Sequence, residues 1–125
     1  MRQSLWVPGP LPGLNELLAA ARSTRGRGSS YASLKRQWGD TVWALAKAAK
    51  LKPVACAELV FEWREPNRRR DPDNVSSAGR KLILDGLVKA GVLSGDGWEG
   101  IYSFQDWWFV DRLEPGVLVK IADAG

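Results

Sequence analysis

The segment 54–64 places apolar side chains at every second position, and this period of two residues predicts a β-strand. Its other face carries charged side chains, among them Glu58, Glu62 and Arg64. The residues of the apolar face are Ala55, Ala57, Leu59, Phe61 and Trp63. A strand of this kind buries only one face, so helices are expected to cover that side of its sheet.

Two longer segments have the period of an amphipathic helix. Apolar side chains recur at three- and four-residue steps over 31–50 and again over 74–90. A short helical turn is expected over 16–21, with Asn15 as its cap. The sequence therefore predicts two main helices and one short helix.

Three further segments, 3–7, 100–110 and 117–121, are predicted to be strands. The first should lie at a sheet edge because a proline-rich stretch follows it. The second is apolar on both faces, which indicates a central strand or a subunit interface, and the third is expected as its antiparallel partner. Together the elements predict one two-layer α+β domain over 1–125, with two main helices on one face of a mixed or antiparallel sheet of about four strands. The open face would serve a homodimer.

The composition narrows the possible chemistry. A chain of 125 residues forms one domain, and neither a membrane span of about 20 apolar residues nor a secretory signal is expected. The single cysteine, Cys56, excludes an internal disulfide framework and a cysteine zinc site. We therefore expect an intracellular (cytoplasmic) protein. Because the chain has no histidine, any hydrolysis must depend on carboxylates, lysine or a metal ion.

The charge is unevenly distributed along the chain. Residues 1–57 contain nine Lys or Arg against two acidic residues, a net charge of +7, and the remainder carries −3. A basic half beside acidic residues suits a polyanion that is held by one surface and cut at another. Scattered surface charges that only keep the protein soluble are the alternative.

Three arginines and two aspartates immediately precede the helix expected over 74–90. Two carboxylates separated by one residue can converge on a hard cation, and Asp96, between two glycines, is the candidate third ligand. Mg²⁺ is bound in this way, with waters and substrate phosphate completing its octahedron. Asp73 could instead be only the helix N-cap. The motif reads Arg68-Arg69-Arg70-Asp71-Pro72-Asp73-Asn74.

Other interpretations of the Asp-x-Asp pattern fit less well. An EF-hand would require an oxygen ligand at Val75, glycine at Ser76 and glutamate at Leu82. A sugar-nucleotide transferase normally has a far longer nucleotide domain, so no nucleotide cofactor is expected.

Two further groups of side chains are candidates for phosphate chemistry. Arg25 and Arg27 lie in a glycine- and serine-rich stretch before a helix, which suits a phosphate-binding loop. Lys81 and Asp85 are one helical turn apart, and the lysine could stabilise charge at a scissile phosphate. A solvated loop and an ordinary surface ion pair are the plainer alternatives.

The block from about 66 to 102 resembles the RusA-type Holliday-junction resolvases, which are small metal-dependent DNA nucleases. The resemblance implies that Asp71, Asp73 and Asp96 bind Mg²⁺ or Mn²⁺ and that a lysine on the intervening helix, here Lys81, is also needed. It departs from the family at Ser77, where the lysine usually stands, and at Gly95, which is often an aspartate. The matching residues are Asp71, Asp73, Asn74, Lys81, Asp85, Gly86, Leu87, Lys89, Ala90, Gly91 and Asp96.

The resemblance further implies a homodimer that resolves branched double-stranded DNA in recombination and repair. Paired, symmetric nicks with 5′-phosphate and 3′-hydroxyl ends are expected, and a phage or prophage origin would suit the family. Arg25, Arg27, Arg68, Arg69 and Arg70 would hold the DNA backbone, with Asn74 and Asp85 in support. A nuclease that cuts flaps or forks, and a DNA-binding protein without catalysis, remain the alternatives.

Overall fold

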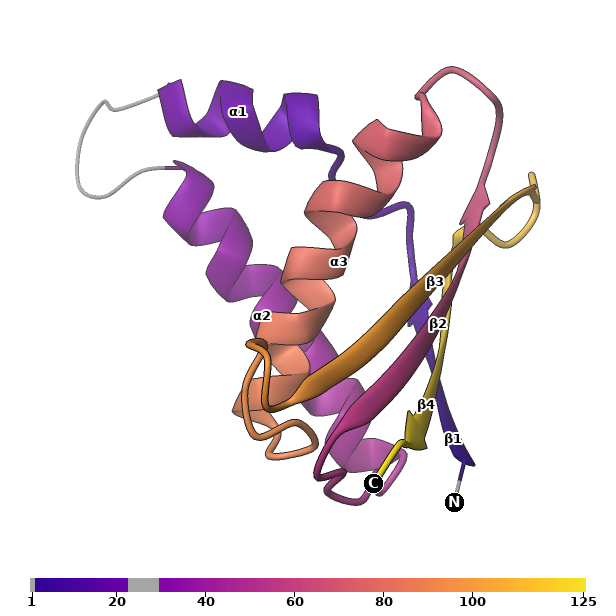
Figure 1. Cartoon of the computed structure of the whole chain (residues 1–125). Helices are drawn as coiled ribbons and strands as arrows, with labels where there is room; N and C mark the ends of the chain where they lie inside the picture. The colour runs from indigo at the N-terminus through magenta and orange to yellow at the C-terminus, as the bar shows by residue number, and fades with distance from the viewer. Residues whose placement is uncertain (1, 23–29) are drawn as a thin grey trace.

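The structure is a computed structural model that describes residues 2–22 and 30–125. It has three helices and a four-stranded sheet, with the helices packed on one face (Figure 1). This arrangement confirms the predicted two-layer α+β domain. None of the described helices combines the length and apolarity needed to cross a bilayer. In chain order the elements are β1 (Arg2–Pro8), α1 (Leu14–Arg22), α2 (Ser30–Ala48), β2 (Ala57–Glu65), α3 (Pro72–Lys89), β3 (Ile101–Val110) and β4 (Gly116–Asp123).

The strand order is β1-β4-β2-β3, and the sheet is mixed. β4 pairs antiparallel with both β1 and β2, whereas β2 and β3 are parallel neighbours joined through α3. The expected β3–β4 hairpin is therefore wrong. β4 lies instead in the interior of the sheet, where Val117, Val119 and Ile121 are buried. β1 is an edge strand as predicted, and β3 forms the other edge.

The core lies between β2 and the helices. Leu59, Phe61 and Trp63 are each at most 1% exposed, which confirms the predicted apolar face of β2. From the helix layer, Ile83 of α3 and Val42 of α2 pack against them in the same core cluster. Full burial of a side chain of this size stabilises the fold by about 1.5–3 kcal/mol. This core holds α3 across the sheet and thereby positions both ends of that helix.

A glycine allows α2 and α3 to pack closely. A Cβ atom built on Gly86 of α3 would lie 2.4 Å from the Cβ of Val42 and 3.1 Å from the carbonyl oxygen of Gly39 on α2. Neither atom can move without shifting the helix or the core. By contrast, a Cβ on Gly39 meets nothing within 4 Å.

Gly86→Ala should therefore destabilise the fold by about 1–3 kcal/mol, because overpacking outweighs the better helix propensity of alanine. Gly39→Ala is the matched control and should be neutral or stabilising by up to about 1 kcal/mol. Urea denaturation of both variants measures the difference. Equal stability of the two would mean that the α2–α3 contact is looser than described.

Candidate active site

The Asp-x-Asp motif lies in the connection from β2 to α3. Because β2 and β3 are parallel, their carboxyl ends lie at the same end of the sheet, where α3 begins (Figure 1). Ligands of α/β units commonly bind at the carboxyl ends of parallel strands, beside the start of the following helix. The fold thus places the motif where a binding site is expected.

Asp71 and Asp73 expose their carboxylates at the start of α3. Asp71 is the N-cap residue, with extended backbone and no side-chain cap hydrogen bond, and Pro72 opens the helix. The expectation that Asp73 is the cap is therefore wrong, since the proline moves the cap position to Asp71. Within residues 2–22 and 30–125, no hydrogen bond or ion pair engages either carboxylate. Both remain available to a ligand.

Arg70 anchors the motif to the rest of the domain. Its Nε and Nη2 donate to the Oε1 and Oε2 of Glu65, at 2.9 and 2.8 Å. Its Nη1 donates to the carbonyl oxygen of Leu11 and to the Oε1 of Glu16, both at 2.9 Å. A guanidinium used in this way has little capacity left for phosphate. The structure thus gives this predicted DNA-binding residue a structural position.

The proline-rich segment before α1 holds the motif from the other side. The backbone N–H of Asn15 donates to the Oδ1 of Asn74 at 2.9 Å. A Cβ on Gly13 would lie 2.8 Å from the Nδ2 of Asn74 and 3.0 Å from the Nη1 of Arg70, so a larger residue would displace these two side chains. Asn74, predicted as a supporting residue, thus joins the starts of α1 and α3.

The remaining predicted arginines fall into two groups. Arg68 and Arg69 are exposed, and no ion pair holds their guanidinium groups among the described residues. The backbone N–H of Arg69 donates to the Oδ1 of Asn67 at 2.9 Å, which shapes the turn before the motif. Arg25 and Arg27 lie outside the described residues. Among the described arginines of the motif, Arg68 and Arg69 are therefore the ones without an ion pair next to the two free carboxylates.

Asp96 lies against the middle of α3. Its Oδ2 accepts a hydrogen bond from the Nζ of Lys81 at 2.6 Å, and the same Nζ is 3.2 Å from the Oδ1 of Asp85. Asp85 also faces Lys35 of α2 at 3.8 Å. The three predicted residues Lys81, Asp85 and Asp96 thus form one surface cluster.

This cluster is separate from Asp71 and Asp73. Lys81 follows Asp73 by eight residues, which is about 12 Å along the axis of α3. The loop that carries Asp96 follows the carboxyl end of α3, and β3, which is parallel to β2, begins at that same end of the sheet, so the loop does not need to return to the motif. Among the described residues, no three His, Cys, Asp or Glu side chains form a group that could hold a metal ion. The predicted convergence of three aspartates is not formed here.

The carboxylate pair at the start of α3 still suits a divalent cation. Mg²⁺ is often held by one or two carboxylates, with waters and substrate phosphate filling its other positions. Asp71 and Asp73 fit that donor set because both are exposed and free of described partners. Asp96 does not fit it in this arrangement, since Lys81 holds its carboxylate.

The Lys81–Asp96 pair also changes the acidity of both groups. Its hydrogen bond to Lys81 lowers the pKa of Asp96, and the same bond raises the pKa of Lys81 against the opposing effect of partial burial. A lowered carboxyl pKa stabilises the fold above the unfolded value of about 4 and loses that effect as the pH falls below it. The contribution is small because both groups are substantially exposed.

Asp96→Asn should consequently lower stability at pH 7 by less than about 1 kcal/mol. The difference from the wild type should vanish as the pH falls from about 4 toward 2, because Asp96 is then protonated in both the folded and the unfolded wild type. Thermal unfolding at pH 7 and pH 2.5 measures this. A difference that persists at the lower pH would show that Asp96 acts through packing and not through its charge.

A pocket opens beside the motif, between the start of α3 and the end of β3. It encloses about 560 Å³. Sequence reasoning placed no functional residue on β3, although the two-sided apolar pattern of that strand was a signal that its side chains needed a partner. The pocket is lined by Glu65, Asn67, Arg68, Arg70, Asp71, Pro72, Val75, Trp108, Phe109 and Val110.

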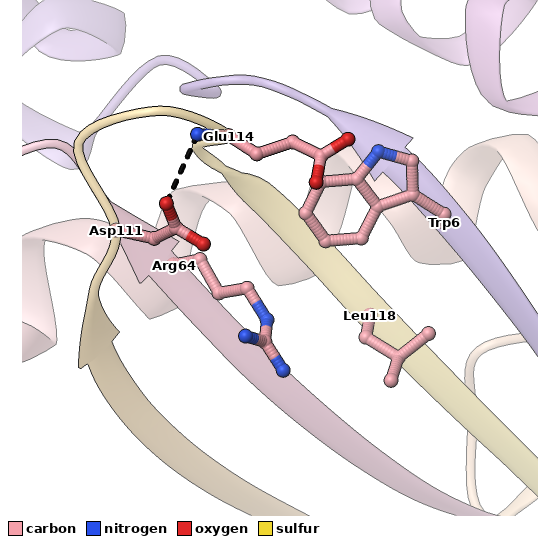
Figure 2. A pocket seen from close by; sticks show the side chains of 5 residues that line it. All are labelled: Trp6, Arg64, Asp111, Glu114 and Leu118. Atoms are coloured by element: carbon pink, nitrogen blue, oxygen red, sulfur yellow. Dashed lines mark hydrogen bonds between the residues drawn. The ribbon is translucent and has the colours of Figure 1, made fainter.

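A second pocket of about 290 Å³ lies on the open face of the sheet, away from the helices (Figure 2). The carboxylate of Asp111 accepts the backbone N–H of Glu114 at 3.0 Å, and the Glu114 side chain extends beside the ring of Trp6. Arg64 and Leu118 complete the lining. The Oδ1 of Asp111 is thus used to close the β3–β4 turn.

No protein-family model matches the chain, and a search of curated proteins finds no significant match. The resemblance to RusA-type resolvases therefore depends on residues 66–102 alone.

Proposed function

We propose that the chain is a metal-dependent endonuclease of the RusA resolvase type that cuts branched DNA. The observation that carries the proposal is the pair of exposed, unpartnered carboxylates of Asp71 and Asp73 in an anchored loop. Exposed arginines stand immediately before this pair, as a polyanionic substrate requires. The negative charge of the two carboxylates at the first turn of α3 suits the positive end of the helix dipole, and the absence of described partners leaves both carboxylates accessible to a ligand as well.

DNA cleavage would require a metal site and contacts with the DNA backbone, and different residues of the motif would provide them. A divalent cation on Asp71 and Asp73 would supply an activated water and would steady the leaving 3′ oxygen. Arg68 and Arg69 would hold the phosphates on either side of the scissile bond and set the register of the strand. Binding should then weaken steeply with salt, as expected for contacts with phosphates.

A homodimer is part of the same proposal, because a two-fold junction needs two coordinated cuts. The open face of the sheet supports it: the cross-strand register aligns Trp6, Leu118, Glu62 and Trp107 across all four strands. Trp107 is exposed, and nothing in the helix layer can reach it from the opposite face. An isologous contact through this row would cover Trp107, the half-buried Trp6 and Leu118, and the second pocket.

A non-catalytic DNA-binding protein is the second candidate. One observation favours it, namely that Lys81 holds Asp96 apart from the carboxylate pair. A binder would use the same arginines and would leave DNA intact.

The experiment that separates these candidates is incubation with labelled four-way junction, flap and linear duplex, each with and without Mg²⁺. The proposal predicts paired nicks in the junction that require the metal. Nicks in the flap alone would assign the same chemistry to another branched substrate. Retardation of the junction without any nicks in Mg²⁺ or Mn²⁺ would contradict catalysis and leave the binding protein.

A further inference from the structure

One face of β3 presents aromatic side chains that α3 covers only in part. The register pairs Phe104 with Leu59 and Trp108 with Trp63, so these two side chains point toward the helix layer. Tyr102 comes two residues before Phe104, at a shift in the register where it has no partner on β2. All three side chains are nevertheless exposed: Phe104 is 41% exposed, Trp108 44% and Tyr102 69%. Because β3 is an edge strand, α3 lies mainly over β2 and leaves much of this row exposed. We call Tyr102, Phe104 and Trp108 the aromatic row.

Arg80 of α3 contacts the aromatic row at Phe104 and also contacts Asp106. The guanidinium of Arg80 on α3 stacks over the ring of Phe104, 4.9 Å from its centroid, and forms an ion pair with Asp106. Asp106 also accepts the indole N–H of Trp63 at 2.9 Å. Asp106 is the only residue between Phe104 and Trp108 on this face, and its charge is compensated by Arg80. The row is therefore an apolar surface without a free negative charge within it.

One end of the aromatic row enters the pocket beside Asp71. Trp108 lines this pocket together with Arg68, Asp71 and Pro72. Its volume of about 560 Å³ is ample for a nucleobase with its sugar. The pocket thus combines a stacking surface, an exposed arginine and a carboxylate of the proposed active site.

We propose that the aromatic row and this pocket bind unpaired nucleotides of a DNA strand. Exposed aromatic side chains beside cationic groups are the usual platform for single-stranded DNA, in which bases stack on rings and phosphates meet arginines. Residues of a strand rise about 3.3 Å each, so Phe104 and Trp108, which are four residues apart, lie about 13 Å apart and offer two separate stacking positions along an extended strand. The substrate class is then DNA in which unpaired bases adjoin a duplex.

Charge favours DNA over a second copy of the chain as the occupant. A protein surface over the pocket would bury the exposed guanidinium of Arg68 and the free carboxylate of Asp71, and both would require new partners. A nucleic acid strand leaves these groups in water and supplies phosphates for the arginine. The role of the row in positioning a strand for cutting depends on the proposed function, whereas binding of unpaired nucleotides does not.

Tryptophan fluorescence tests the inference in EDTA, where no cutting can occur. The wild type is titrated with a twelve-residue oligothymidine and, separately, with a blunt duplex. The oligonucleotide should bind and quench the fluorescence, and Trp108→Ala should weaken this binding about tenfold. Trp43→Ala is the matched control, since Trp43 is 39% exposed on α2 away from the row, and it should leave the affinity unchanged. Tyr102→Ala tests the same row if Trp108→Ala fails to fold.

Three results would overturn the inference. The wild type could show no binding to the oligonucleotide, or Trp43→Ala could weaken binding as much as Trp108→Ala. Alternatively, Trp108→Ala could leave the affinity unchanged and convert a dimer into a monomer in sedimentation, which would make the row an interface between copies. Junction nicking that persists without oligonucleotide binding would refute this inference alone, and oligonucleotide binding without nicking would refute only the nuclease.

Discussion

Asp73→Asn should reduce metal-dependent nicking of a four-way junction by about 10²-fold or more while leaving junction binding equal or stronger. The substitution removes one of the two free carboxylates proposed to hold the cation, whose charge stabilisation amounts to several kcal/mol. Binding survives because the lost charge repels phosphate and Arg68 and Arg69 are untouched. Single-turnover nicking and gel retardation of the same junction measure the two effects.

The controls for this prediction are other exposed aspartates. Asp40→Asn, on α2, removes a carboxylate that pairs with Lys89 and should leave nicking unchanged. Asp96→Asn distinguishes two arrangements of the site. If Lys81 keeps Asp96 apart from the carboxylate pair, Asp96→Asn should reduce activity far less than Asp73→Asn. An equal loss of activity would show that Asp96 leaves Lys81 and joins Asp71 and Asp73 when the substrate binds. Loss of junction binding in Asp73→Asn would instead assign that residue a structural role.

Arg70→Ala should lower the free energy of unfolding by about 2–4 kcal/mol, with a fall of roughly 10 °C in Tm. The variant leaves Glu65, whose side chain is 12% exposed, without its bidentate partner and frees the carbonyl oxygen of Leu11. Arg70→Lys should recover only part of the loss because an ammonium cannot reproduce the planar fork. Thermal and urea denaturation measure both variants.

Arg68→Ala is the counterpart of Arg70→Ala. Arg68 has no described partner, so Arg68→Ala should change the free energy of unfolding by less than about 0.5 kcal/mol. The Arg68→Ala variant should bind DNA more weakly. The slope of its affinity against salt concentration, on logarithmic scales, should fall by about 1, as expected for the loss of one phosphate contact. A stable Arg70→Ala variant with weak DNA binding would reverse the two assignments and make Arg70 the phosphate ligand.

Local sequence patterns predicted most elements of the fold. The alternation over 54–64 identified the buried face of β2, and the prolines after 3–7 identified β1 as an edge. The position of β4 could not be obtained in this way, because the short turn before it favours a hairpin with β3. Burial of Val117, Val119 and Ile121 in the centre of the sheet, a long-range effect, decides the pairing instead.

The candidate site was predicted in part. The spacing of Asp71 and Asp73 before a helix located the free carboxylates correctly at the start of α3. The position of Asp96 depended on the direction of β3, because a parallel β3 begins at the far end of α3 and its preceding loop does not need to return to the motif. Nothing in the sequence distinguished Arg70 from Arg68, since only the fold brings Leu11, Glu16 and Glu65 around one of them.

Manganese titration followed by NMR tests most directly whether the carboxylate pair at the start of α3 holds the cation. Substoichiometric Mn²⁺ should first broaden the amide signals of Asp71, Asp73 and Asn74, and the double substitution Asp71→Asn with Asp73→Asn should remove this effect. Broadening that begins at Lys81 and Asp96, or that spreads evenly over acidic residues of the surface, would contradict binding by this pair.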